Sequence, residues 1–158
     1  MSEKIASFAA GCFWGVEARF REAPGVLDAV SGYMGGHTDQ PTYKQVCAGD
    51  SGHAEAVQVT FDDEQISFRE LLNLFFDMHN PTTLNRQGPD FGSQYRSAVF
   101  WHDEEQREAT EQKIKEVNAS GKWPDPVVTQ LAKAPTFWPA EEYHQRYLEK
   151  HGMGFCSL

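Results

Sequence analysis

The chain has 158 residues, 40% of them hydrophobic, and a formal net charge of −9. This length suits one domain with a substantial core, and an acidic chain without a Lys/Arg cluster argues against nucleic acid as a partner. No apolar run is long enough to span a membrane. Three cysteines without a CxxC pair are typical of a reducing, cytoplasmic setting rather than of a disulfide framework.

The first two predicted elements meet at a cysteine. Residues 5–10 read as a short buried strand, and Phe13, Val16 and Phe20 follow at helical spacing. Cys12 is therefore expected in the first turn of a helix, where unpaired backbone N–H groups and the helix dipole favour a reactive thiolate. An ordinary buried structural cysteine is the alternative, and this stretch alone leaves both open.

A second extended segment and a long loop come next. Pro24 and Gly25 end the helix, and residues 26–33 read as a strand. Residues 35–52 are rich in glycine and polar side chains and show no sustained periodicity. A loop of this length in a compact domain is usually functional or disordered, and its tyrosine and cysteine favour a functional loop.

Residues 54–61 alternate as a half-buried strand, with Val57, Val59 and Phe61 on one face. Glu55 has the same parity as these apolar residues, so we expect its carboxyl group on the core side of the sheet. Burial there would raise the pKa of Glu55 and let it hold a proton near neutral pH. If the strand becomes regular only after Glu55, the carboxylate is solvated instead.

The remaining chain alternates between helices, loops and strands. A Ser67–Glu70 capping box begins a strongly apolar helix that ends before Pro81. The later expected elements are a loop over 82–93, a strand over 95–101, a charged helix over 103–118, a strand over 127–131, a helix over 139–149 and a glycine-containing flexible tail over 151–158. This interspersed order indicates a single α+β domain with helices against a mixed sheet.

The three cysteines lie in different predicted settings: Cys12 at a helix start, Cys47 in a polar loop and Cys156 on a flexible tail. These settings limit the kinds of reaction that the cysteines can perform. No CxxC, CxxH or HExxH spacing is present, so we expect no metal site. A Cys-His hydrolase is compatible with the composition, but the six histidines offer no sharp partner. A redox cycle uses the pattern better, because it needs one fixed thiol, Cys12, and one thiol on a flexible tail, Cys156.

Several motifs together resemble a known family. The segments are Gly11-Cys12-Phe13-Trp14-Gly15, Pro41-Thr42-Tyr43 through Val46-Cys47, Gly52-His53-Ala54-Glu55 and Asp90-Phe91-Gly92-Ser93-Gln94-Tyr95-Arg96-Ser97. In this order and at these intervals, they are similar to the signature of the peptide methionine sulfoxide reductase A family.

The resemblance implies an enzyme that reduces the S epimer of methionine sulfoxide, free or in proteins, with thioredoxin as reductant and no prosthetic cofactor. It also implies a two-layer α/β sandwich around a ferredoxin-like mixed β-sheet, wrapped by long coil segments. We expect residues 1–158 to form one such domain, a cytoplasmic monomer that repairs oxidative damage.

The resemblance assigns four residues to the chemical step. Cys12 matches the nucleophile that attacks the sulfoxide sulfur, and Glu55 matches the acid that protonates the oxygen. Tyr43 and Tyr95 match its hydrogen-bonding companions. A neutral acid and phenol hydroxyls suit this reaction, because a sulfoxide oxygen is a strong acceptor that must be protonated as it leaves sulfur.

The other matched residues concern substrate binding and recycling. Phe13 and Trp14 match a pocket for the substrate methyl group, and Asp90 matches a residue that orders the site. Cys156 is then the resolving cysteine that forms a disulfide with Cys12. Cys47 also falls in a family motif, and we expect it to be a small buried structural side chain.

Two other interpretations use the same cysteine pair. A peroxide-reducing or thiol-disulfide oxidoreductase needs Cys12 and Cys156 but no methyl pocket. A non-enzymatic redox switch also needs only the disulfide, and it leaves Glu55 and the two tyrosines without a role.

Overall fold

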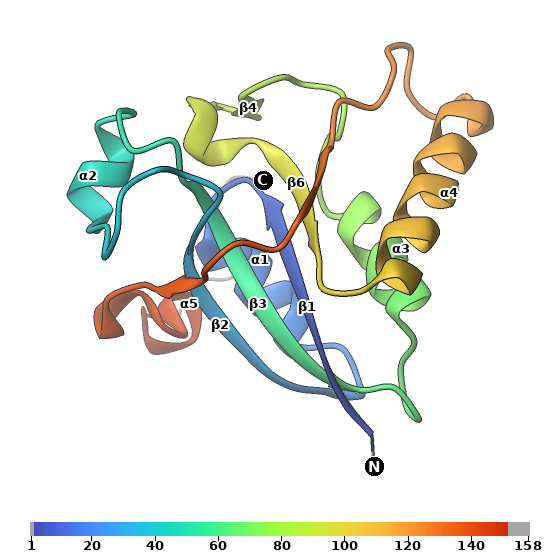
Figure 1. Cartoon of the computed structure of the whole chain (residues 1–158), viewed down its shortest axis with the longest axis horizontal. Coiled ribbons are helices and arrows are strands. Elements are labelled where there is room, and N and C mark those ends of the chain that lie inside the picture. The colour runs from blue at the N-terminus through green and yellow to red at the C-terminus, as the bar shows by residue number, and fades with distance from the viewer. Residues whose placement is uncertain (1, 152–158) are drawn as a thin grey trace.

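The computed structural model describes residues 2–151, which form an open β-sheet with helices packed on one side (Figure 1). The strands are β1 (Glu3–Ala10), β2 (Val26–Met34), β3 (Ala54–Asp62), β4 (Arg86–Gln87), β5 (Asp90–Phe91), β6 (Ser97–Trp101), β7 (Gln130–Lys133) and β8 (Trp138–Pro139). The helices are α1 (Phe13–Arg21), α2 (Tyr43–Cys47), α3 (Phe68–Asp77), α4 (Glu104–Ser120) and α5 (Tyr147–His151), with 3₁₀ turns η1 (Ser93–Tyr95) and η2 (Glu142–His144). None of these helices has the length and apolarity needed to cross a lipid bilayer.

The main sheet has the strand order β7-β6-β1-β3-β2-β8. Its centre, β6-β1-β3-β2, is antiparallel throughout, with α1 between β1 and β2 and α3 between β3 and β6. This is the βαββαβ arrangement of ferredoxin-like folds. β7 adds to β6 in parallel, and β8 adds to β2 antiparallel. The expected α+β sandwich with a ferredoxin-like mixed sheet is confirmed.

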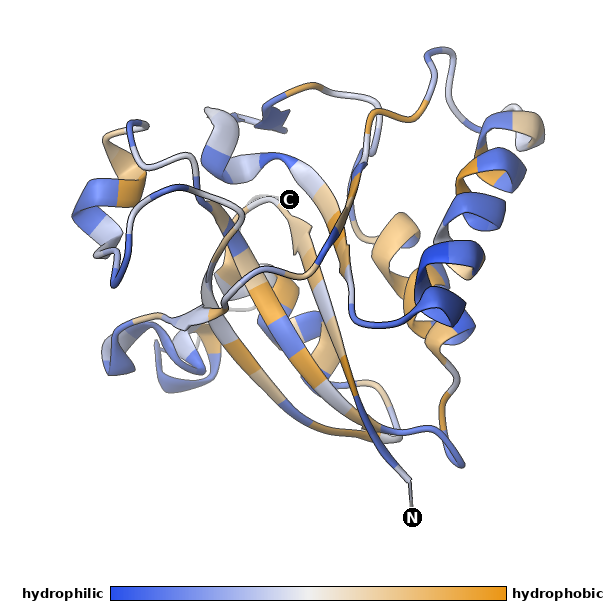
Figure 2. Ribbon diagram, viewed as in Figure 1, coloured by the Kyte–Doolittle hydropathy of each residue, from blue (hydrophilic) through white to orange (hydrophobic). Residues whose placement is uncertain are grey.

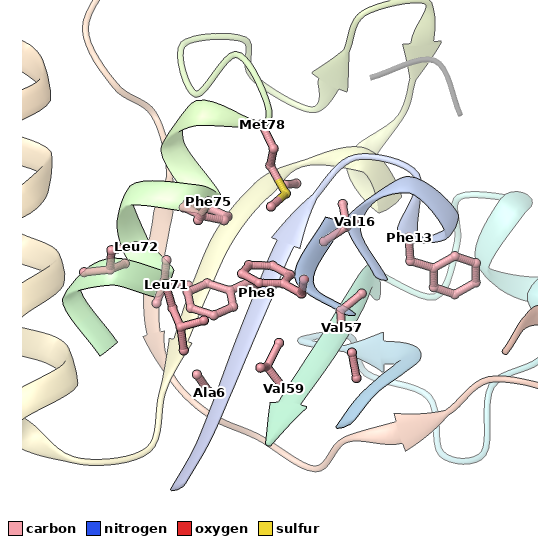
Figure 3. Packing of buried hydrophobic residues seen from close by; sticks show 14 of the residues in the cluster. Ala6, Phe8, Phe13, Val16, Val57, Val59, Leu71, Leu72, Phe75 and Met78 are labelled. Atoms are coloured by element: carbon pink, nitrogen blue, oxygen red, sulfur yellow. The ribbon is translucent and has the colours of Figure 1, made fainter. Parts of the chain in front are cut away.

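The helical face of the sheet holds the larger core. Phe8 of β1 lies at its centre, with its ring centroid 5.0 Å from that of Phe20 and 5.3 Å from that of Phe75. Figure 3 shows Phe13 at the opposite end of this cluster from Leu72. The apolar face of α3 begins at the expected capping box. Helix α4 is mostly hydrophilic (Figure 2) and contributes only partly buried hydrophobic residues, among them Ile114 and Val117, to the edge of this core. The core therefore joins α1 and α3 to the sheet and fixes where α1 begins.

The opposite face of the sheet is covered by coil rather than by helices. Its buried side chains are mostly small: Ala9, Ala54, Ala56 and Ala98, with Met34 and Phe100. The segment between β7 and β8 crosses in front of the sheet in Figure 1. A Cβ atom on Gly32 of β2 would lie 2.4 Å from Phe137 and 2.5 Å from the carbonyl oxygen of Trp138. Glycine at this position allows the close approach of the crossing segment.

Three features between residues 35 and 133 differ from the sequence prediction. The loop over 35–52 contains the short helix α2, which begins at a capping box formed by Thr42 and Gln45. Tyr95 lies in the 3₁₀ turn η1, and the strand starts only at Ser97. The later strand also begins after residue 127, at Gln130.

The predicted helix over 139–149 is wrong, because long-range hydrogen bonds break it into β8, η2 and α5. Arg146 has a left-handed φ of 55° and donates its backbone N–H to both carboxylate oxygens of Glu17 in α1, at 3.1 and 2.9 Å. The Gln145 side chain pairs with the backbone of Ser31 in β2, accepting at 2.9 Å and donating at 2.9 Å. These bonds attach the C-terminal segment, residues 139–151, to α1 and β2.

Candidate active site

Cys12 lies at the junction between β1 and α1. Gly11 has a φ of 99°, a conformation that favours glycine, and it turns the chain out of the sheet. Cys12 is then the N-cap residue of α1, and its side chain is buried with 8% exposure. The sulfur is therefore near the positive end of a helix dipole, as predicted, which favours the thiolate.

Glu55 is buried beside this helix start. It lies on the helical face of β3, as the alternation predicts, and is 1% exposed. The backbone N–H of Phe13, the residue after Cys12, donates to Glu55 Oε1 at 3.2 Å. One contact thus places a carboxyl group next to the candidate nucleophile, and burial of this kind disfavours a charged carboxylate.

Tyr43 comes to the same place from α2. Its ring is stacked against that of Phe13 at a centroid distance of 6.3 Å. Burial, a hydrogen bond with the Cys47 side chain and the charge of Glu55 raise the pKa of Tyr43. The phenol therefore stays protonated and can act as a neutral hydrogen-bond donor.

Tyr95 and Asp90 come from the β4–β5 hairpin and the turn that follows it. Burial is the largest cause that raises the pKa of Tyr95, and the charges of Glu55, Cys47, Asp90 and Cys12 raise it further. Tyr95 is thus within electrostatic range of the candidate acid and nucleophile. Partial burial also raises the pKa of Asp90.

Phe13 and Trp14 occupy the first turn of α1 in different environments. Phe13 is 1% exposed and contacts Tyr33 and Tyr43 with its ring. Trp14 is half-buried and stacks on Tyr147 of α5, with centroids 3.7 Å apart and the rings 7° from parallel. These rings place aromatic surface on both sides of the helix start.

The C-terminal segment contributes two site residues that the sequence reasoning missed, Glu141 and His144. Glu141 accepts hydrogen bonds from the Tyr33 hydroxyl at 2.8 Å and from the Tyr43 backbone N–H at 2.9 Å. Burial alone would raise the pKa of Glu141, but these hydrogen bonds bring it below its usual value. His144 accepts from Trp14 Nε1 at 2.9 Å. Spacing of polar residues at 141, 144 and 145 was the available signal, but it also fits one face of an ordinary helix.

Apart from Cys12, the chain contains two cysteines, Cys47 and Cys156. Cys47 is exposed, so the expectation of a buried structural side chain is wrong. Cys47 lies at the end of α2, and its sulfur forms a hydrogen bond with the Tyr43 side chain. Partial burial raises the pKa of the Cys47 thiol, whereas the hydrogen bond with Tyr43 lowers it. Cys156 and the tail from residue 152 lie outside the described residues.

The described side chains suit nucleophilic attack on a centre that carries a protonatable oxygen. They combine a thiol at a helix start, a buried carboxyl group and two neutral phenols around it. Within residues 2–151, no three His, Cys, Asp or Glu side chains gather closely enough to hold a metal ion.

Comparison with known sequences gives a consistent result. A family model described as "Peptide methionine sulfoxide reductase" matches residues 4–158. A protein of that name, MsrA, from Acidobacterium capsulatum is 53% identical over 153 residues, which cover 97% of this chain and 98% of the relative. MsrA from Methanoculleus marisnigri is 54% identical over 151 residues, covering 96% and 92% of the two chains.

Solved structures show the same likeness in three dimensions. Reduced Mxr1 from Saccharomyces cerevisiae has a TM-score of 0.89 and 39% identity, covering 98% of this chain and 89% of that one. Methionine sulfoxide reductase A of Corynebacterium diphtheriae gives 0.85 and 35%, covering 98% and 77%. Mxr1 in complex with Trx2 gives 0.63 and 29%, covering 92% and 84%.

Proposed function

This chain belongs to the peptide methionine sulfoxide reductase family, and from that membership we infer that it reduces methionine sulfoxide to methionine with thioredoxin as electron donor. The substrate is the S epimer, free or within oxidised proteins. Residues 1–158 act as one reductase domain, as a cytoplasmic monomer that repairs oxidised methionine. The thiols supply the electrons, so the reaction requires no prosthetic group.

In the first step the Cys12 thiolate attacks the sulfoxide sulfur. Glu55 donates a proton to the sulfoxide oxygen, and the hydroxyls of Tyr43 and Tyr95 hydrogen-bond to that oxygen as its charge grows. The attack forms a bond between the two sulfurs; the protonated oxygen then moves from the substrate sulfur to Cys12 as this S–S bond and the S–O bond of the substrate break, so methionine leaves and Cys12 becomes a sulfenic acid. Sulfur of the substrate is reduced by two electrons, and sulfur of Cys12 is oxidised by two.

Substrate orientation falls to the aromatic pair at the start of α1. Phe13 and Trp14 form an apolar pocket that receives the substrate methyl group, and Asp90, whose charge acts on Tyr95, orders the site. When the methyl group and the oxygen of the substrate are both held in place, only one of the two sulfoxide epimers turns its sulfur atom toward the Cys12 thiolate. This accounts for the choice of the S epimer.

In the second step Cys156 restores the enzyme. Its thiol condenses with the Cys12 sulfenic acid, which forms a Cys12–Cys156 disulfide and releases water. The dithiol of thioredoxin then reduces this disulfide by exchange and returns both cysteines to thiols.

The contact between Glu55 and the backbone of Phe13 is the observation that carries this proposal. It supports an acid held beside the nucleophile, a group for which a redox switch has no use. A peroxide-reducing enzyme could use the acid, but it has no need of the apolar pocket formed by Phe13 and Trp14. Burial disfavours the charged form of the Glu55 carboxyl group, which supports its use as the proton donor in a reaction that consumes a proton.

Turnover with separated sulfoxide epimers tests the proposal. With thioredoxin, thioredoxin reductase and NADPH present, we expect NADPH oxidation with methionine S-sulfoxide and none with the R epimer. Cys12→Ser should abolish it, whereas Cys47→Ser, the matched change at the other described cysteine, should retain it. Turnover by Cys12→Ser, equal use of both epimers, or preference for hydrogen peroxide in competition would contradict the assignment.

A further inference from the structure

The indole of Trp14 is held from two directions by the C-terminal segment. Tyr147 fixes its plane through a stack 3.7 Å apart. His144 fixes its rotation within that plane, because Nδ1 accepts the indole N–H at 2.9 Å. A half-buried tryptophan in the first turn of a helix has access to water for this N–H, yet here it is used by a residue 130 positions away.

His144 is itself placed at the centre of the aromatic cluster. Its ring lies 5.1 Å from Phe13, 4.3 Å from Tyr43 and 4.1 Å from Tyr143, and the residue is 1% exposed. Since the indole can only donate, Nδ1 carries no proton and the neutral ring carries its proton on Nε2. Nε2 is buried and has no hydrogen-bond partner among residues 2–151.

Residues 2–151 offer this buried N–H group no compensation for the water it loses, so their arrangement is unfavourable for stability alone. A phenylalanine would fill the same aromatic space without that penalty. The hydrogen bond to Trp14 is what a histidine adds at this position.

We propose that His144 is a positioning residue: its Nδ1 holds the Trp14 indole in the orientation that forms one wall of the methyl pocket beside Cys12. The inference rests on the proposed function, because the pocket belongs to it. His144 acts through Trp14 and does not touch the reacting atoms. Tyr147 also holds the Trp14 indole in place, because its ring is stacked on one face of the indole.

Steady-state kinetics give the first test. His144→Phe keeps the ring and removes the acceptor, so kcat/KM for methionine S-sulfoxide should fall about 10- to 100-fold. Most of the loss should be in KM, because the wall contacts the methyl group in ground and transition states alike. His144→Asn, whose Oδ1 can take the place of Nδ1, should recover most of it, and His37→Asn at an exposed histidine should change nothing. Wild-type kinetics in His144→Phe would overturn the proposal.

A double-mutant cycle tests whether His144 acts through Trp14. In a Trp14→Phe background, His144→Phe should change kcat/KM by less than about twofold. A full additional loss in that background would show that His144 acts elsewhere, and the proposal would be wrong.

An NMR readout keeps the test independent of activity. The chain has four tryptophans, and the indole N–H signal of Trp14 is assigned from Trp14→Phe. Its exchange with water should be at least about tenfold faster in His144→Phe than in wild type, with the other three indole signals unmoved. Unchanged exchange would overturn the inference. If the wild-type protein reduced neither epimer, the proposed function would fail while this contact could still be judged.

Discussion

Acidification should weaken the fold through His79, which ties the end of α3 to the start of β6. The residue is 5% exposed; Nδ1 donates to the Phe75 carbonyl at 2.6 Å, and Nε2 accepts from the Ser97 hydroxyl at 2.7 Å. Burial is the main cause that lowers the pKa of His79 from 6.5 to about 4. The native state therefore holds this imidazole neutral at pH values where the unfolded chain protonates it.

The direction in which the free energy of unfolding changes with pH follows from the number of protons that each state binds. Between about pH 6.5 and pH 4 the unfolded state binds a proton that the native state does not, so the free energy of unfolding decreases as the pH falls. Each pH unit of difference corresponds to about 1.4 kcal/mol, so the interval between 6.5 and about 4 amounts to about 3 kcal/mol. The contribution is complete above pH 6.5 and lost near pH 4.

Urea unfolding of the wild-type protein and of His79→Gln between pH 4 and pH 8 measures how much His79 contributes to the pH dependence of the free energy of unfolding. The glutamine is neutral at every pH, so the difference in free energy of unfolding between the two proteins should change by about 3 kcal/mol across the range. Parallel pH profiles would refute the reasoning. So would an NMR titration of the His79 ring in native protein with a midpoint near 6.5.

Three further changes test other parts of the molecule. Glu55→Gln should slow single-turnover reduction of methionine S-sulfoxide by about two to four orders of magnitude, because the proton donor is lost; an unchanged rate would remove Glu55 from the acid role. Cys156→Ser should release about one equivalent of methionine per enzyme and then stall with thioredoxin, and sustained turnover would mean another thiol resolves Cys12. Gly32→Val should lower the free energy of unfolding by about 1–3 kcal/mol, since its Cβ meets Phe137 and the backbone of Trp138; an unchanged urea midpoint would contradict this.

Local patterns were sufficient to predict an α+β domain and several of its elements, whereas the ferredoxin-like sheet was predicted from the resemblance to the family. Alternation along β3 placed Glu55 on the core side, and Ser67 with Glu70 marked the start of α3. Cys12 at the start of α1 followed from the strand and helix periodicities on either side of it. Each of these signals lies within one element, where spacing alone decides which face a side chain takes.

The errors came where distant contacts override local preference. Residues 139–149 have a helical pattern, but Glu17 takes the backbone N–H of Arg146 that a continuous helix would use, and Ser31 binds the Gln145 side chain. Nothing in the sequence near Trp14 indicates that its partner is His144. Cys47 was expected to be buried because cysteines usually are, but it lies exposed at the end of the short helix α2, which begins at the Thr42–Gln45 capping box.

The attachment of the C-terminal segment also has a consequence for synthesis. Cys12 leaves the ribosome well over a hundred residues before Glu141 and His144, which complete its surroundings. A nascent chain that has reached β7 already carries the cysteine and Glu55, but not the groups that fix Tyr43 and Trp14. During translation Cys12 therefore stays incompletely covered until the C-terminal segment that carries Glu141 and His144 has been synthesised and has packed against α1.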